Sequence, residues 1–275
     1  MTTLATVLPA AHAGFPILSL IILAPVIAVF ALLFTPANNH RAIRTISTLG
    51  TAVSLVGTIY VARVLSLAPT TDFTLVERIN VIPSMGIEYV VAADGWSAVL
   101  LLLTGVIAFA GAIASYAVSD RPREYYAFLL LLVAGVFGVF VIQDLFIFFL
   151  FYEIAVLPMY LLIGIWGSSG SVPADGPFKW VFEKLDVGGK EYAAMKLTLM
   201  LLVGSALILA AILGMYHEAD GTFSMIAMEE VEFSHTLQML AFPALWIGFG
   251  SLAGLWPFHT WSPDGHAAAP TAVSM

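Results

Sequence analysis

Four side chains that can carry protons lie in or beside apolar segments of this sequence. Glu153 is the only charged residue in LFIFFLFYEIAVLPMYLLIGIW, the segment Leu145–Trp166, and Lys196 lies near the start of a later apolar segment. His259 and His266 lie in PFHTWSPDGH, close to the C-terminal end. Carboxyl, amino and imidazole groups can all take up and release protons, and inside membranes such groups commonly mark ion or proton pathways.

The environment of Glu153 follows from the length of its segment. A transmembrane helix needs roughly 20 apolar residues, so Glu153 falls near mid-membrane, where an ionised group costs at least ~2.5–3.5 kcal/mol. Pro158 removes one backbone hydrogen bond from the same helix and predicts a kink close to the carboxyl group. We therefore interpret Glu153 as a proton-binding residue. The structural alternative is a protonated side chain held by one buried hydrogen bond.

Lys196 also has two interpretations. A lysine near a helix end can extend its side chain to the membrane surface, where the ammonium group stays hydrated. Alternatively, it pairs with a carboxylate or faces a hydrated axis inside the protein. Lysine suits that second role because burial moves its proton affinity readily.

Residues 252–275, LAGLWPFHTWSPDGHAAAPTAVSM, are rich in proline and glycine. No continuous helix tolerates such crowding, so we expect a break within Gly254–Pro263 that faces protein or a water-filled cavity. The letters SPDG predict a restart with Ser262 as N-cap, Pro263 at the first helical position and Asp264 in the first turn. The two histidines either pass protons at the break or bond to its freed backbone carbonyls.

No metal or cofactor site is indicated. Two histidines and one aspartate among prolines have no established ligand spacing. A chain without cysteine has no disulfide, thiolate metal site or iron–sulfur cluster, so we expect no cofactor and no metal on this chain. The net charge of −8 argues against nucleic acid as a partner, because nucleic acid requires basic patches.

The elements that position these side chains are apolar helices. The chain is 60% hydrophobic and only 10% charged, whereas a soluble domain has about 25% charged residues. This composition predicts an all-α polytopic membrane protein with about seven transmembrane helices, the seventh broken, in a single transmembrane domain of residues 1–275. The predicted spans are Phe15–Phe34, Thr45–Leu67, Trp96–Val118, Tyr125–Ile142, Leu145–Trp166, Tyr192–Tyr216 and Thr236–Leu255.

The loops predict an orientation and some local structure. Basic residues gather in the first, third and fifth loops, which places those loops in the cytoplasm and the N-terminus outside. Both long loops, Ala68–Gly95 and Ser168–Glu191, are candidates for hairpins, and FKWVFEKL in the second is a candidate surface helix. The basic residues that set the orientation are Arg41, Arg44, Arg121, Arg123, Lys179, Lys184 and Lys190.

Three motifs together resemble one membrane-protein family. FYEIAVLPMYLLIGIWG, AAMKLTLM and PFHTWSPDGHAAAPTAVSM are similar to segments of the antiporter-like membrane subunits of respiratory complex I, with the closest likeness to subunit M, or chain 4, of bacterial NADH–quinone oxidoreductase. The resemblance covers roughly residues 95–275. Its most specific part is the run P-x-H-x-W-x-P-D-x-H…A-P-T, from Pro257 through Thr271.

The resemblance implies a proton-translocating subunit of a redox-driven assembly in the bacterial inner membrane. Family members have about fourteen transmembrane helices in two inverted repeats, so this chain would be the N-terminal half, with helices one to seven and no second repeat. The family's proton-path residues match Glu153, Lys196, His259 and His266. Its partners would be other membrane subunits, which would carry the redox centres.

The chain departs from the family pattern at Leu252, where family members usually have a lysine that pairs with the glutamate of helix five. This departure leaves other functions open. The related alternatives are an Mrp-type cation/proton antiporter, a membrane-bound hydrogenase subunit, and a structural or assembly subunit that does not pump. A retinal protein would need a lysine in its seventh helix for the Schiff base, and Thr236–Leu255 contains none.

Overall fold

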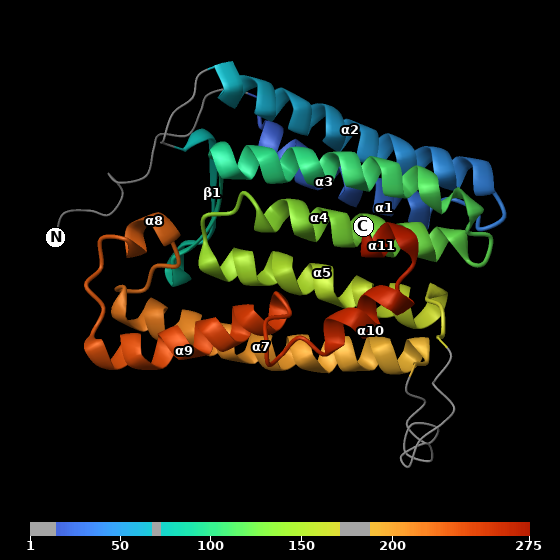
Figure 1. Ribbon diagram of the computed structural model, residues 1–275. Coiled ribbons are helices and arrows are strands. Elements are labelled where there is room, and N and C mark those ends of the chain that lie inside the picture. Colours follow the sequence, from blue (N-terminus) through green and yellow to red (C-terminus); the bar gives the residue numbers. More distant parts are fainter. Residues whose placement is uncertain (1–14, 68–72, 171–187) are drawn as a thin grey trace, which may run out of the picture.

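The computed structural model describes residues 15–67, 73–170 and 188–275, and this part of the chain is mostly helical. Long helices run alongside one another in a bundle (Figure 1). Each of the predicted apolar segments contains or overlaps one of them. They are α1 (Ile17–Leu33), α2 (His40–Leu67), α3 (Gly95–Ala114), α4 (Pro122–Val139), α5 (Leu145–Trp166), α7 (Lys190–Glu218) and α9 (His235–Leu252).

Fewer helices than predicted meet the requirements of a full membrane span. Within the described residues, 5 helices are long and apolar enough to cross a membrane, namely α2, α3, α4, α5 and α7. Helix α1 has only 17 residues and α9 has 18. The predicted amphipathic segment FKWVFEKL lies outside the described residues.

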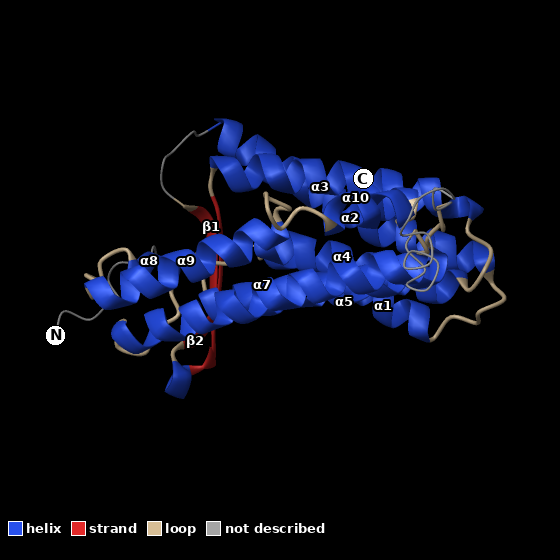
Figure 2. Cartoon of the chain, turned by 60° about the horizontal axis from the view of Figure 1, so that its bottom comes forward, coloured by secondary structure: helices blue, strands red, loops and turns tan. Residues whose placement is uncertain are grey.

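A two-stranded hairpin crosses the bundle near one end (Figure 2). Strand β1 (Thr74–Ile82) pairs antiparallel with β2 (Ile87–Ala93) through a short turn, Pro83–Met85. Gly86 ends this turn with a φ of 64°, and a side chain at this position would collide with the carbonyl oxygen of Gly221. The hairpin predicted in the first long loop is therefore confirmed.

The hairpin also supplies a hydrogen-bond acceptor for the first backbone N–H groups of α1. These N–H groups have no acceptor within the helix itself. The Glu77 carboxylate of β1 accepts hydrogen bonds from the backbone N–H groups of Leu18 (2.8 Å) and Ser19 (3.1 Å). On the other strand, the β2 backbone pairs with the turn before α5, where Ala92 N–H donates to the Val141 carbonyl at 2.8 Å. One small element thus joins the starts of two helices that are far apart in sequence.

Helices α4 and α5 pack closely because two glycines face α5. A Cβ at Gly135 would lie 2.8 Å from the Phe151 carbonyl oxygen, and one at Gly138 would overlap the Phe151 ring. Small residues at such contacts allow close approach of helices, which is how membrane helices gain packing energy without a hydrophobic driving force.

The predicted break after α9 is confirmed, but its restart differs from the prediction. Helix α9 ends at Leu252, Gly254 has a φ of 65°, and α10 (Trp261–Ala268) begins at Trp261, so Ser262 is not the N-cap. The indole N–H of Trp261 donates to the Ser251 carbonyl oxygen at 2.8 Å, which fixes the start of α10 beside the end of α9. Pro263 is tolerated as the third helical residue because the first N–H groups of a helix need no partner within it. A last short helix, α11 (Thr271–Ser274), follows.

Candidate functional site

Glu153 lies near the middle of α5 with an unsatisfied oxygen atom. Its side chain is partly buried, and its Oε1 atom is buried with no hydrogen-bond partner among the described residues. A buried polar atom without a partner is costly, and a water molecule that bonds to it relieves that cost. The neighbouring Tyr152 hydroxyl oxygen accepts a hydrogen bond from Ser205 Oγ on α7 at 3.2 Å, so the helix beside Glu153 is held by a polar contact.

Lys196 pairs with an aspartate that follows the break. Its Nζ atom lies 2.7 Å from Asp264 Oδ2, with the Lys196 side chain 24% and the Asp264 side chain 43% exposed. The ammonium group also lies 5.6 Å from the centre of the Tyr192 ring. Of the two interpretations of Lys196, the structure therefore agrees with pairing to a carboxylate.

The structure does not bring Lys196 to Glu153. The hydrogen bond between Ser205 and Tyr152 places Glu153 beside the middle of α7. Lys196 lies nine residues before Ser205, which is about 13 Å along the helix axis at roughly 1.5 Å per residue. Any proton exchange between these two residues would need intervening water or other groups.

The two histidines occupy separate places. His259 lies exposed in the connection between α9 and α10, and its backbone carbonyl accepts a hydrogen bond from Ser262 N–H at 3.0 Å. His266 is exposed on α10, and its Nδ1 atom lies 3.2 Å from Ser274 Oγ. Within the described residues, neither imidazole bonds a carbonyl of the break. The four predicted residues therefore form an extended set rather than one cluster.

Leu252 occupies an apolar environment at the end of α9. It is partly buried and packs against the hydrophobic cluster that contains Val156 and Trp261, with Tyr152 at its edge. The position at which the resemblance implies a lysine thus lies among hydrocarbon side chains, beside a cluster that includes Val156 of α5.

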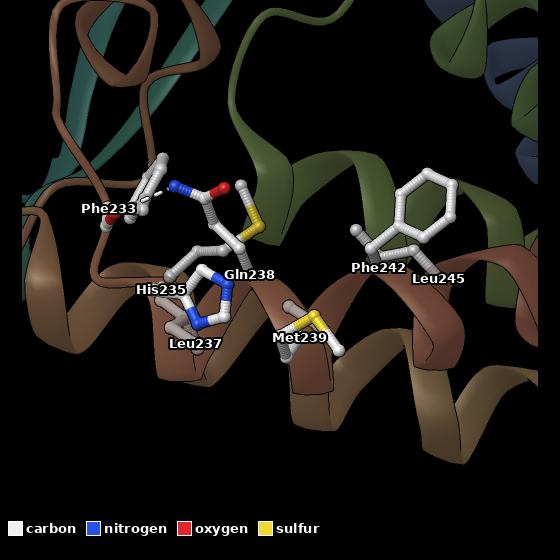
Figure 3. Close-up of a pocket in the computed structure, with 9 residues that line it drawn as sticks. Phe233, His235, Leu237, Gln238, Met239, Phe242 and Leu245 are labelled. Atoms are coloured by element: carbon white, nitrogen blue, oxygen red, sulfur yellow. Dashed lines mark hydrogen bonds between the residues drawn. The ribbon is translucent and has the colours of Figure 1, made fainter.

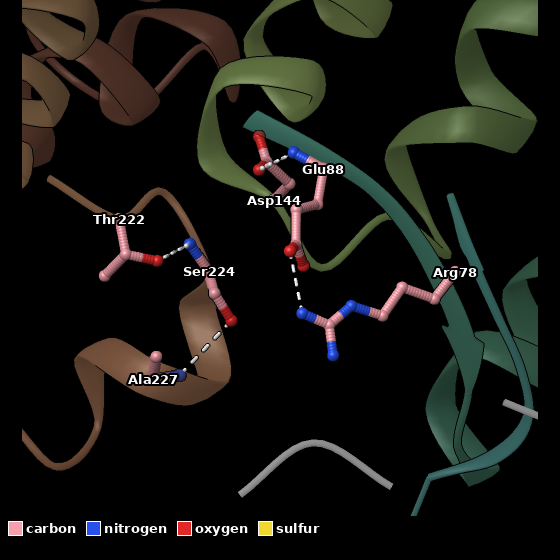
Figure 4. Close-up of polar contacts among 6 residues, drawn as sticks. All are labelled: Arg78, Glu88, Asp144, Thr222, Ser224 and Ala227. Atoms are coloured by element: carbon pink, nitrogen blue, oxygen red, sulfur yellow. Dashed lines mark hydrogen bonds and ion pairs between the residues drawn. The ribbon is translucent and has the colours of Figure 1, made fainter. Parts of the chain in front are cut away.

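A polar network at the hairpin end was not predicted from the sequence (Figure 4). Asp144 is only 1% exposed and accepts hydrogen bonds from Phe146 N–H (3.0 Å), Ile147 N–H (3.0 Å) and Glu88 N–H (3.1 Å). Burial raises the pKa of the Asp144 carboxyl, and the three N–H donors limit the rise. Glu88 in turn forms an ion pair with Arg78 at 2.7 Å. A lone aspartate directly before an apolar segment was the available signal, because aspartate is a favoured N-cap.

The same end of the bundle carries an apolar groove of about 410 Å³ between the start of α9 and the end of α7 (Figure 3). Its few polar groups belong to His235 and to Gln238, whose amide donates to the Phe233 carbonyl oxygen at 2.8 Å. The groove lies at the far end of α7 from Lys196. Its other lining residues are Met215, Leu237, Met239, Ala241, Phe242 and Leu245.

Comparisons with known proteins show which proteins the chain is similar to. Residues 186–275 match the family described as "NADH:quinone oxidoreductase/Mrp antiporter, TM". The chain is 35% identical over 262 residues to NAD(P)H-quinone oxidoreductase chain 4 of Gloeobacter violaceus, covering 95% of this chain and 46% of that protein. It is 34% identical over 266 residues to NAD(P)H-quinone oxidoreductase chain 4 2 of Microcystis aeruginosa, covering 96% of this chain and 44% of that protein. The chain thus spans about half the length of these relatives.

Two solved structures have the same fold. A chain of respiratory complex I from Thermus thermophilus superposes with a TM-score of 0.75 at 23% identity, over 94% of this chain and 48% of that chain. A chain of the membrane-bound sulfane sulfur reductase, an archaeal respiratory membrane complex, gives a TM-score of 0.71 at 20% identity, over 94% of this chain and 37% of that chain. The chain is therefore a multi-pass membrane protein whose residues 186–275 belong to the NADH:quinone oxidoreductase/Mrp antiporter transmembrane family, and over 95% of its length it is similar to NAD(P)H-quinone oxidoreductase chain 4.

Proposed function

We propose that this chain is part of a proton-translocating membrane subunit in a redox-driven assembly of the NAD(P)H–quinone oxidoreductase type. The observation that carries the proposal is the buried, unsatisfied Oε1 atom of Glu153 near the middle of α5. Carboxyl groups at membrane depth commonly line ion or proton paths, and Glu153 is the group proposed for that role here. The names of the relatives and the fold of the solved structures support the proposal.

In this proposal the chain provides one part of the proton path. Glu153 accepts a proton, and Lys196, His259 and His266 relay protons along a hydrated axis. The electron-transfer centres and the remaining membrane subunits are partners. The chain is a single transmembrane domain, residues 1–275, with the seven helices of the N-terminal half of a fourteen-helix fold. It lies in the bacterial inner membrane with the N-terminus outside.

The test is Glu153→Gln in the assembled complex, reconstituted into vesicles. Protons translocated per electron should fall sharply, while electron transfer to quinone continues when the membrane is uncoupled. Glu124→Gln is the matched control, because Glu124 lies in the first turn of α4 beside Arg123, away from mid-membrane. Unchanged proton translocation in an assembled Glu153→Gln complex would refute the role of this residue.

A second candidate function is a structural subunit that no longer pumps. The observation that favours it is the hydrocarbon packing around Leu252, which places no cation from α9 next to the α5 flank. In that case, Glu153→Gln and wild-type complexes would translocate protons equally, and deletion of the chain would reduce assembly instead.

A further inference from the structure

We propose that Asp264 is a positioning residue, which holds the Lys196 ammonium group and thereby fixes the short helix α10 against α7. This proposal rests on the proposed function, because it assigns a role within the same proton path. The observation behind it is the 2.7 Å ion pair between two side chains that are 68 residues apart in sequence.

Helix α10 is held to three different helices. At its start, the Trp261 indole donates to the Ser251 carbonyl oxygen of α9. At its end, the Ala268 carbonyl oxygen accepts from Ser168 N–H at 2.8 Å, just after α5. Between these points, Asp264 reaches Lys196 on α7. The two outer contacts are neutral hydrogen bonds, whereas the central one is an ion pair that depends on charge.

The place of Asp264 in the fold suits contact with a cation. The residue lies in the first turn of α10, where the helix dipole stabilises a negative charge. Beside it, a Cβ at Gly265 would lie 3.0 Å from the Leu197 side chain, so α10 packs closely on α7 at the pair. This close packing places the charged groups of the two helices directly against each other.

The solvent exposure of the Lys196–Asp264 pair favours a role in positioning over a role in folding stability. With the Lys196 side chain 24% and the Asp264 side chain 43% exposed, the pair adds little to folding stability, because solvent screens such pairs. Its main effect is to fix where the Lys196 ammonium group lies and how α10 sits on α7. Loss of charge on either partner removes this attraction while the Trp261 and Ser168 contacts remain.

The experiment uses the assembled complex in vesicles and compares Asp264→Asn with Asp264→Glu. Asp264→Asn should lower protons translocated per electron by about two-fold or more, with normal amounts of complex in the membrane. Asp264→Glu keeps the charge and should restore most of the coupling. Glu191→Gln is the matched control, because Glu191 is an exposed carboxylate in the first turn of α7, and it should leave coupling unchanged.

A second measurement reports the position of α10 directly. Amide hydrogen exchange in residues 261–268 should be roughly two- to five-fold faster in Asp264→Asn than in wild type, with exchange in α5 unchanged. Normal coupling together with unchanged exchange in Asp264→Asn would overturn the proposal. If Glu153→Gln lowers coupling while Asp264→Asn changes neither quantity, only the positioning role fails. If Glu153→Gln has no effect on coupling, the proposed function itself fails.

Discussion

Lys196 and Asp264 form an ion pair of 2.7 Å that joins the first turns of α7 to the helix following the break. Helix α10 and the start of α7, which carry the pair, lie toward the end of the bundle away from β1 (Figure 1). The helix that follows the break, α10, is therefore fixed to a neighbouring helix by a contact whose strength depends on two charges.

The orientation of the chain can be tested with reporter fusions. A reporter inserted in the loop between α5 and α7 should be cytoplasmic, and one inserted near Asp220 should be external. The reason is that Arg41, Arg121 and Lys190 all lie at the same end of the bundle, and basic loops remain in the cytoplasm. Alkaline phosphatase and green fluorescent protein fusions would measure this. The opposite pattern would reverse the direction of the proposed path.

Replacement of Leu252 by lysine should change the charge state of Glu153. Leu252 packs against the cluster that includes Tyr152 and Val156 of α5, and an opposite charge within about 4–6 Å of a carboxyl group stabilises its ionised form. Infrared difference spectra at neutral pH should show a weaker protonated-carboxyl band than in wild type. Leu252→Met, which keeps the volume and adds no charge, should leave the band unchanged. An unaltered band in Leu252→Lys would show that position 252 does not reach Glu153.

Asp144 predicts a pH dependence of stability. Because burial raises its pKa in the folded state, its favourable contribution is fully present below the usual value of 3.8 and is lost as pH rises through the raised pKa. The difference in melting temperature between wild type and Asp144→Asn should therefore shift against the wild type as the pH rises above about 4. Thermal unfolding in detergent would measure it.

A substitution at a second N-cap aspartate is the control for that experiment. Asp94→Asn removes the carboxylate of another N-cap, which accepts from Ser97 N–H at 2.7 Å at the start of α3, but Asp94 is more exposed than Asp144. The change in melting temperature of Asp94→Asn measures the effect of losing an N-cap carboxylate that is less buried. A wild-type advantage over Asp144→Asn that grows with pH would contradict the predicted sign.

The contact between α4 and α5 should not tolerate a methyl group at Gly138. Gly138→Ala places that group on the Phe151 ring, and overpacking of this kind costs typically ~1–3 kcal/mol. The melting temperature should fall accordingly. Gly95→Ala is the control: no atom lies within 4 Å of a Cβ at that position, so stability should stay equal or rise slightly. Equal melting temperatures for the two variants would show that α4 can move away from α5.

Segments with a strong local signal could be predicted from the sequence. The boundaries of the Leu145–Trp166 helix follow from its apolar run, and Asp144 before it explains where the helix begins. The break followed from proline and glycine content, which acts locally. The start of α10 could not be predicted in this way, because the bond from Trp261 to Ser251 depends on the folded path of the connection.

The pairs that define the site depend on tertiary structure. Lys196 was expected either at the membrane surface or beside a carboxylate, but nothing in the sequence pattern identifies Asp264 as that carboxylate. The pairing depends on how α10 folds back onto α7 after the break. For the same reason, the bond from Glu88 to Asp144 could not be predicted, since it requires the hairpin to lie beside the turn before α5.

The hairpin links the starts of helices at one end of the bundle through hydrogen bonds to the backbone. Glu77 binds the start of α1, β2 pairs with the turn before α5, and Leu145 N–H donates to the Phe223 carbonyl oxygen beyond α7. Relative sliding of these helices at the hairpin end would break several backbone hydrogen bonds at once. An angular motion between α1 and α5 that preserves these bonds must therefore pivot at the hairpin.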